Sequence, residues 1–300
     1  MNIDGLSLDQ LRIFLLVVEE GSFSGAARRV RRAQSAVSYA IGMLERQLGV
    51  RLFDRAAARS ALTPEGRALL ADARLLVDRA DGLKARARAL ASGLEPEVGL
   101  VADVMFPVEE LALVLADFQA AFPTVTARLH VEALGRVAEL VLDGTCELGI
   151  QGTLPETPPG LSSHVLRPLV IIPVAAPGYL RAGEDGLVPD EALRDAVQIV
   201  LTDRSSLTAG QDFFVLSART WRVADLGAKH ALIRAGLGWG GLPQHLIAED
   251  VAAGRLVPLR MGHLPPSGDR LPVRAIQRTG RALGPAATWL WRRLTALSPE

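Results

Sequence analysis

The chain has 300 residues, of which 49% are hydrophobic and 22% are charged, and this is enough for two domains with separate cores. No apolar run approaches the roughly 20 residues that a membrane helix needs, and the acidic residues near the start argue against a signal peptide. A single cysteine, Cys146, excludes an internal disulfide, and five scattered histidines give no metal-ligand spacing. We therefore expect a cytoplasmic protein with no membrane contact, no metal and no cofactor.

The net charge of zero conceals an asymmetry between the two ends of the chain. Residues 1–92 hold 15 Lys and Arg against 10 Asp and Glu, so the rest of the chain holds 18 against 23. Residues 24–59 alone contain eight Arg and two acids. A basic block on an acidic body favours a polyanion as the partner of the N-terminal part, although a solvated Arg-rich face would give the same counts.

Three helices are predicted in the first fifty residues. Apolar side chains recur at helical spacing over 8–20, and the break after them leads into a short helix over 25–30 with Ser24 as its N-cap. A third helix over 34–48 carries an apolar stripe that ends at Leu48. Two short helices joined tightly are typical of a helix-turn-helix.

The outer face of the third helix is small and polar. It carries Ser35, Ser38 and Tyr39, and small side chains allow a helix to approach base edges in a major groove. Residues 49–55 and 60–63 follow as two extended segments, which we expect to pair as a wing.

Four strings in this region occur in a characteristic order and spacing: GSFSGAA at 21–27, QSAVS at 34–38, LERQLGVRLFDR at 44–55 and LTPEG at 62–66. Together they resemble the DNA-binding domain of the LysR family of transcriptional regulators. The resemblance implies a winged helix-turn-helix domain, which we place at 6–63, with the helix-turn-helix at about 23–42.

Three positions depart from the pattern of that family. Ala33 stands where a serine usually caps the recognition helix, and this should cost about 1 kcal/mol unless another group caps it. Ser35 replaces a common proline, and Tyr39 replaces a frequent arginine. The operator sequence therefore cannot be inferred from the family.

The partner predicted for this domain is double-stranded DNA. We expect Gln34, Ser35 and Ser38 to contact bases, and the arginines to contact mainly phosphates. The full set of predicted DNA-binding residues is Ser24, Arg31, Arg32, Gln34, Ser35, Ser38, Tyr39, Arg55 and Arg59.

Residues 64–92 predict one long helix with a heptad pattern. Leucines recur every seven residues with alanines between them, which is typical of a seam between two helices. We predict a dimerising linker helix, and family members dimerise through the same helix, but packing against its own domain would also explain the pattern. The seam consists of Leu69, Ala73, Leu76, Ala80, Leu83, Ala87 and Leu90.

Residues 93–300 alternate strand and helix patterns, which predicts α/β layers with parallel strands. The strings AGLGWGGLP at 235–243 and GRLV at 254–257 resemble the effector domain of the same family, which implies a two-lobed fold like that of periplasmic binding proteins. We place lobe I at about 97–162 and 271–300, and lobe II at about 163–270. Strands are expected near 98–102, 125–131, 147–150, 170–176, 197–201, 222–224 and 271–276, and helices near 107–121, 137–142, 227–235 and before 291.

A small-molecule effector is expected in the cleft between these lobes. Asp103 ends the first strand of the domain, where the resemblance places a pocket residue that is usually Ser or Thr. Either Asp103 binds an effector bearing an amine, a guanidine or several hydroxyls, or it pairs with Lys229 as an internal latch; it could also cap the following helix. The predicted effector-binding set is Asp103, Val104, Met105, Thr202, Arg204, Ser205 and Lys229.

Other patterns do not support an enzyme. The glycines of 236–241 fit G-x-G-x-x-G, but they follow a helix pattern, whereas a dinucleotide fingerprint follows a strand. Cys146 lies in an apolar segment typical of a buried small side chain. We therefore predict a sequence-specific, effector-controlled transcriptional regulator that acts as a homodimer or homotetramer. The alternative is a solute-binding protein without a transcriptional role.

Overall fold

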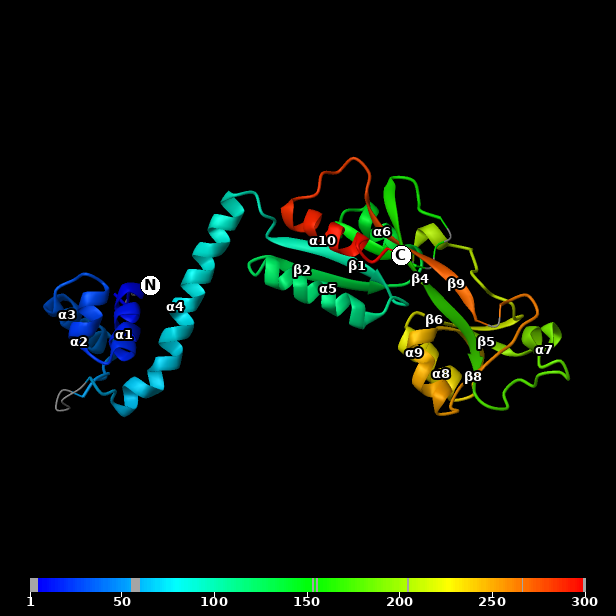
Figure 1. The fold of residues 1–300 in the computed structure, drawn as a ribbon, viewed down its shortest axis with the longest axis horizontal. Helices are drawn as coiled ribbons and strands as arrows, with labels where there is room; N and C mark the ends of the chain where they lie inside the picture. The colour runs from blue at the N-terminus through cyan, green and yellow to red at the C-terminus, as the bar shows by residue number, and fades with distance from the viewer. Residues whose placement is uncertain are drawn as a thin grey trace. The chain divides into compact units, whose positions relative to one another are not determined.

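A computed structural model describes residues 5–54, 60–152, 154, 156–203, 205–265 and 267–298. The chain divides into two compact units, Met1–Ala91 and Ser92–Glu300. Figure 1 shows the first unit as helices alone, whereas the second is built around a sheet. Among the described residues, no helix combines the length and the apolar character needed to cross a membrane.

The N-terminal unit contains four helices in an order that agrees with the prediction. Its core joins apolar residues of all four, and the rings of Phe14 and Phe23 both contact Phe53 edge-on. Phe53 forms an antiparallel bridge with Leu62, so the two wing segments do pair, while residues 55–59 lie outside the described part. The helices are α1 (Leu8–Glu20), α2 (Phe23–Arg29), α3 (Gln34–Leu48) and α4 (Pro64–Ala91).

Two local predictions for this unit are wrong. The N-cap of α2 is Ser22 rather than Ser24, because Gly21 ends α1 at φ 65° and leaves Ser22 as the next extended residue. The Ser22 hydroxyl accepts the Gly25 N–H at 3.0 Å. At the end of α3, Leu48 is exposed rather than part of the buried stripe.

In the described part of the C-terminal unit, nine strands form one sheet in the order β2-β1-β3-β9-β4-β7-β5-β6, with β8 paired to β4. Parallel pairs occur at both ends of this order, as predicted: β1 with β2 and β3, and β5 with β6 and β7. At its centre the long strands β4 and β9 run antiparallel and join two halves. The strands are β1 (Glu97–Asp103), β2 (Thr126–Glu132), β3 (Leu148–Gln151), β4 (Leu161–Ala175), β5 (Val197–Leu201), β6 (Arg219–Val223), β7 (Trp239–Pro243), β8 (Val257–Pro258) and β9 (Asp269–Arg278).

Helices pack against the strands at each end of the sheet, so the unit consists of two halves. The first half contains β1, β2 and β3, and the second contains β5, β6 and β7. The first half's helices are α5 (Val108–Ala121), α6 (Gly135–Leu142) and α10 (Pro285–Thr295), and the second half's are α7 (Asp190–Asp195), α8 (Leu226–Arg234) and α9 (Gln244–Ala252).

The predicted elements depart from the structure in two ways: α7, β7, α9 and β8 were not expected, and β4 begins nine residues before the expected segment. The first part of β4, around Ser162 and Ser163, is polar and partly exposed. It lacks the apolar run that predicts the later part of the strand. The glycines of 236–241 follow α8 and lead into β7. This order, helix then strand, is the reverse of a dinucleotide-binding turn.

Candidate functional site

The first candidate surface is the start of α3. Gln34, Ser35, Ser38 and Tyr39 are exposed there, with 68% of Tyr39 accessible to solvent. Val37, Ile41 and Leu44 lie on the buried side of the helix and fix its orientation on the core. The N-cap residue Ala33 makes no side-chain hydrogen bond, so the expected loss of a cap is confirmed.

The arginines beside this surface differ in their partners. Arg32 donates to both carboxylate oxygens of Asp9, at 2.7 and 3.3 Å, and the hydrogen bond to Asp9 raises the pKa of Arg32. Arg31 is exposed in the turn between α2 and α3 with φ 55°; its backbone N–H donates to Arg28, and no described residue forms a hydrogen bond or ion pair with its guanidinium. Arg31 is therefore the arginine of this turn most available to a phosphate. Arg55 and Arg59 lie outside the described residues.

The heptad positions of α4 divide into two groups. Ala73 is buried, and Leu69 and Ala80 are partly buried, on the side of α4 that packs against α1. The leucines at the other positions project from this unit: Leu76 is 48% exposed, Leu83 70% and Leu90 47%. Part of the predicted seam thus belongs to the unit's own core, and the exposed part is the leucine row.

The second candidate site centres on Lys229 of α8. Only 5% of this lysine is exposed, and no described residue forms a hydrogen bond or ion pair with its side-chain ammonium. Burial lowers the pKa of Lys229 to about 8. Strand β7 passes close beneath the side chain, because Gly240 has no Cβ; a Cβ there would lie 3.2 Å from Cε of Lys229.

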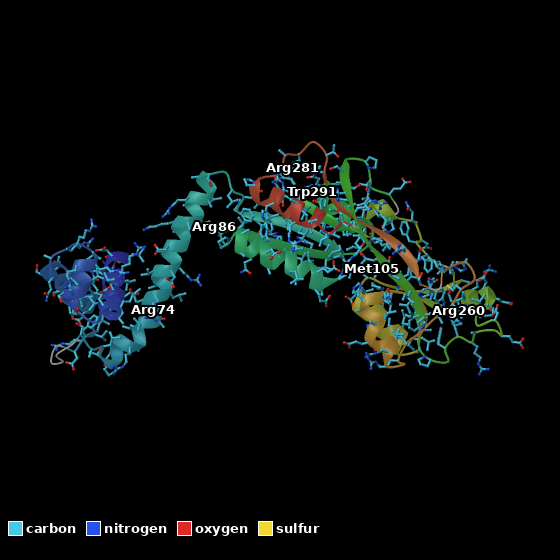
Figure 2. The ribbon with its side chains drawn as sticks, in the orientation of Figure 1. Arg74, Arg86, Met105, Arg260, Arg281 and Trp291 are labelled. Atoms are coloured by element: carbon cyan, nitrogen blue, oxygen red, sulfur yellow. The ribbon has the colours of Figure 1, made fainter. Side chains whose placement is uncertain are left out.

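A cavity of about 110 Å³ opens beside Lys229. Its walls come from both halves and from the two joining strands, and Figure 2 shows Met105 between the halves. Two wall residues, Leu134 and Phe214, have positive φ angles of 51° and 57°, a strained backbone conformation for residues with a side chain. The walls are Met105, Leu134, Ile171, Gln198, Ile199, Val200, Leu201, Phe213, Phe214, Lys229, Gly241, Asp269 and Leu271.

A second cavity of about 320 Å³ adjoins the first and shares Leu134 and Phe213 with it. Thr202 and Ser205 line the second cavity, so two further predicted residues lie near Lys229. Arg204 lies outside the described residues.

Asp203, which the sequence analysis missed, links the two halves here. Its carboxylate accepts the backbone N–H of Arg136 in α6 at 3.1 Å and the hydroxyl of Thr208 at 2.7 Å. Ser206 adds a hydrogen bond of 3.2 Å to Glu139 of α6. The position of Asp203 directly after a buried strand was an available signal, because ligand crevices border such strand ends.

Asp103 is buried, with 1% of its surface exposed. Its carboxylate accepts the N–H of Met105 at 2.9 Å and the N–H of Gly152 at 3.3 Å. The latch with Lys229 is not formed, since no ion pair joins these two described residues. Asp103 holds the turn after β1, and the helix-capping alternative is wrong, because the N-cap of α5 is Pro107 and no side chain caps that helix.

Val104, next to Asp103, faces a different groove. This groove of about 620 Å³ lies between α5, α8 and α9, away from Lys229. Asp250 in its wall shares a hydrogen bond of 2.5 Å with His230 and accepts one from Arg255. The hydrogen bond from Arg255 is the largest cause of the lowered pKa of Asp250. The cluster ties α8 to α9 and has the character of a structural ion pair.

Cys146 is buried in the first half, and burial raises the pKa of its thiol to about 12. A thiol that stays protonated at neutral pH is a poor nucleophile and a poor redox sensor. The cysteine therefore acts as a small apolar side chain.

Two family models match the chain. Residues 8–67 match the bacterial regulatory helix-turn-helix protein of the lysR family, and residues 91–298 match the LysR substrate binding domain. The chain belongs to the LysR family. This LysR-family protein is a transcriptional regulator with a DNA-binding helix-turn-helix and an effector-binding domain.

Relatives span almost the whole LysR-family chain. It is 27% identical over 299 residues to the probable HTH-type transcriptional regulator YhaJ of Escherichia coli K12, with 97% of each chain covered. It is 27% identical over 256 residues to the HTH-type transcriptional activator AllS of Klebsiella pneumoniae, which covers 84% of this chain and 94% of AllS.

Solved structures share the fold. CrgA of Neisseria meningitidis, a LysR-type transcriptional regulator, matches with a TM-score of 0.50 and 22% identity over 97% of this chain and 99% of CrgA. Full-length LysG of Corynebacterium glutamicum, solved with bound effector Arg, matches with a TM-score of 0.50 and 21% identity over 97% of this chain and 98% of LysG.

Proposed function

We propose that this regulator binds its operator through the exposed start of α3 and that a ligand in the C-terminal unit controls this binding. The observation that carries the first part is the exposure of Gln34, Ser35 and Ser38 on a helix whose other face is buried. Amide and hydroxyl side chains at that place donate and accept hydrogen bonds to base edges. Arg31 and the arginines of the wing would hold phosphates and set the register.

We propose that two copies pair through the leucine row of α4. Leu76, Leu83 and Leu90 expose apolar surface at spacings of seven residues, which is the pattern of a helix that packs against a second helix. A symmetric pair would present two α3 helices to two half-sites on the DNA. We place the protein in the cytoplasm, with the chromosomal DNA, and assign it no catalytic role.

We propose that the effector binds in the cavity beside Lys229, with its outer end toward the adjoining cavity. Met105, Thr202, Ser205 and Lys229 would face the effector there. Asp103 would act from behind them by holding the turn that carries Met105.

The proposal is tested by fluorescence anisotropy with two labelled duplexes, the DNA upstream of the protein's own gene and a scrambled duplex of equal length. Tighter binding to the first, by about a thousandfold or more at fixed salt, is expected. Equal affinity for both duplexes at several promoters would contradict sequence-specific regulation.

A further inference from the structure

Lys229 is a buried cation to which no described residue supplies a counterion. Taking an ammonium out of water costs free energy that a nearby carboxylate normally offsets. No described residue supplies one within ion-pair distance, although Asp269 lies in the wall of the same cavity. Asp269 is exposed at the start of β9, where water surrounds it. The fold therefore holds a positive charge beside a cavity and leaves it to an incoming group to neutralise it.

The cavity sets the size and polarity of that group. An engineered apolar cavity of about 150 Å³ holds benzene, so a volume of about 110 Å³ accepts an apolar body of about five carbon atoms. Most of the walls are aliphatic or aromatic, with Ile171, Ile199 and Leu271 among them. Apart from Lys229 and Asp269, the described wall residues carry no charge.

The polar wall group Gln198 is already occupied by the protein. Its amide donates to the carbonyl of Phe214 at 2.8 Å, and its oxygen accepts the N–H groups of Leu216 and Ser217 at 2.8 and 3.1 Å. These bonds hold the segment that forms the outer wall and use both lone pairs of the amide oxygen, so only one neutral N–H of Gln198 is left for a ligand. Within this cavity, one positive charge beside a single neutral amide donor suits an anion with a single charge.

We propose that the Lys229 cavity binds a small monocarboxylate, with its carboxylate on the ammonium of Lys229 and an apolar body of about five carbons against the aliphatic walls. This inference rests on the proposed function of the cavity as the effector site. A cationic ligand would place two like charges together at low dielectric, and a dianion would leave one negative charge unpaired. The carboxylate of Asp103 offers no competing site for an amine, because backbone N–H groups already bind it.

Three probes of one shape isolate the charge: 3-methylbutanoate, its amide 3-methylbutanamide, and 3-methylbutylamine. Each is titrated by calorimetry into the full-length protein at neutral pH, together with straight-chain carboxylates from propanoate to hexanoate. At least one carboxylate of the series is expected to bind at least tenfold more tightly than the amide, and the amine is expected not to bind.

Two variants locate the site. Lys229→Met keeps the apolar length of the side chain and removes the charge, so carboxylate affinity should fall at least tenfold. Lys84→Met is the matched control, because Lys84 is the other lysine of the sequence and lies exposed on α4. Thermal unfolding of Lys229→Met verifies that the variant is folded.

The proposal is overturned if no carboxylate binds at millimolar concentration, if the amide or the amine binds as tightly, or if Lys229→Met leaves carboxylate affinity unchanged. The effect on operator DNA is measured separately by anisotropy. Lys229-dependent binding of a carboxylate that leaves operator affinity unchanged would support the ligand class and contradict the role of this cavity as the effector site.

Discussion

The two units of this regulator place their functional polar groups in opposite surroundings. Arg31 and Gln34 stand exposed on the N-terminal unit, whereas Lys229 is buried in the C-terminal unit next to a cavity. Exposed positive charge attracts a polyanion over a large surface, and such binding weakens strongly as the salt concentration rises. Buried charge binds one small group, and salt screens it little. One unit is therefore suited to a long polymer and the other to a small molecule.

Binding to a long DNA site requires two α3 helices, one from each of two paired chains. Loss of this pairing should have the largest effect on the N-terminal unit. Leu76→Asp should place two like charges in the helix pair and separate it into monomers. Operator affinity should then fall by about 10²- to 10⁴-fold, because the two half-sites are no longer bound together. Sedimentation and anisotropy measure the two effects.

Leu75→Asp is the matched control for that variant. Leu75 is on the same helix and 53% exposed, but it lies outside the heptad row. It should leave both the oligomeric state and DNA binding nearly unchanged. A Leu76→Asp protein that stays dimeric at micromolar concentration would mean that the leucine row does not form the interface.

The buried charge of the C-terminal unit should show in the pH dependence of stability. The folded pKa of Lys229, about 8, lies below its ordinary value of 10.5, so between these values the unfolded chain binds more protons than the folded one. Protonated Lys229 therefore destabilises the fold below about pH 8, and this loss disappears as pH rises toward 10.5. Lys229→Met should be more stable than the parent by about 1–3 kcal/mol near neutral pH.

Urea unfolding at neutral pH and near the ordinary lysine pKa measures this difference. The gain from Lys229→Met should shrink at the higher pH, while Lys84→Met, at an exposed position, should show no such trend. A gain that is the same at both pH values would mean that folding does not lower the pKa of Lys229.

In the N-terminal unit, two neighbouring residues should separate base recognition from phosphate binding. Gln34→Ala should lower the preference for operator over random DNA by about 1–3 kcal/mol, since it removes a side chain that contacts base edges. Arg31→Ala should weaken binding to both duplexes equally. The slope of log affinity against log salt concentration should fall by the contribution of about one phosphate contact. Anisotropy at several salt concentrations measures both. If Gln34→Ala left the preference intact, base recognition would have to come from another part of the unit.

The same contrast explains which features of the two units could be predicted from the sequence. The proposed DNA-binding surface consists of residues that lie close together in the sequence on one helix, so periodicity alone placed Ser35 and Ser38 on its exposed face. The heptad pattern of α4 was visible too, but periodicity could not tell that Ala73 packs on α1 while Leu83 does not. Neighbouring rows of side chains on one helix are separated by only a fraction of a turn around the helix axis. Only tertiary packing decides which row is buried.

The cavity of the C-terminal unit is assembled from segments far apart in the sequence. Met105, Gln198, Lys229 and Leu271 meet only because β4 and β9 bring the two halves together. The sequence predicts the end of each strand separately but not which strand ends meet. Asp103 is therefore predicted to bind the effector because it ends a strand. The sequence could not show that the N–H groups of Met105 and Gly152 already satisfy its carboxylate.

The smallest expected effect concerns the contact between the two halves. Asp203→Asn keeps the shape of the side chain but removes the negative charge that accepts the Arg136 N–H near the start of α6. A charge-assisted hydrogen bond becomes a neutral one at a helix N-terminus, which should cost about 0.5–1 kcal/mol. The amide of Arg136 should therefore exchange with deuterium severalfold faster, and carboxylate affinity should fall by a similar factor, because the halves separate more often. Asp117→Asn is the control, since Asp117 pairs with Arg293 inside the first half. Unchanged exchange at Arg136 in Asp203→Asn would show that the cavity is held closed by the joining strands alone.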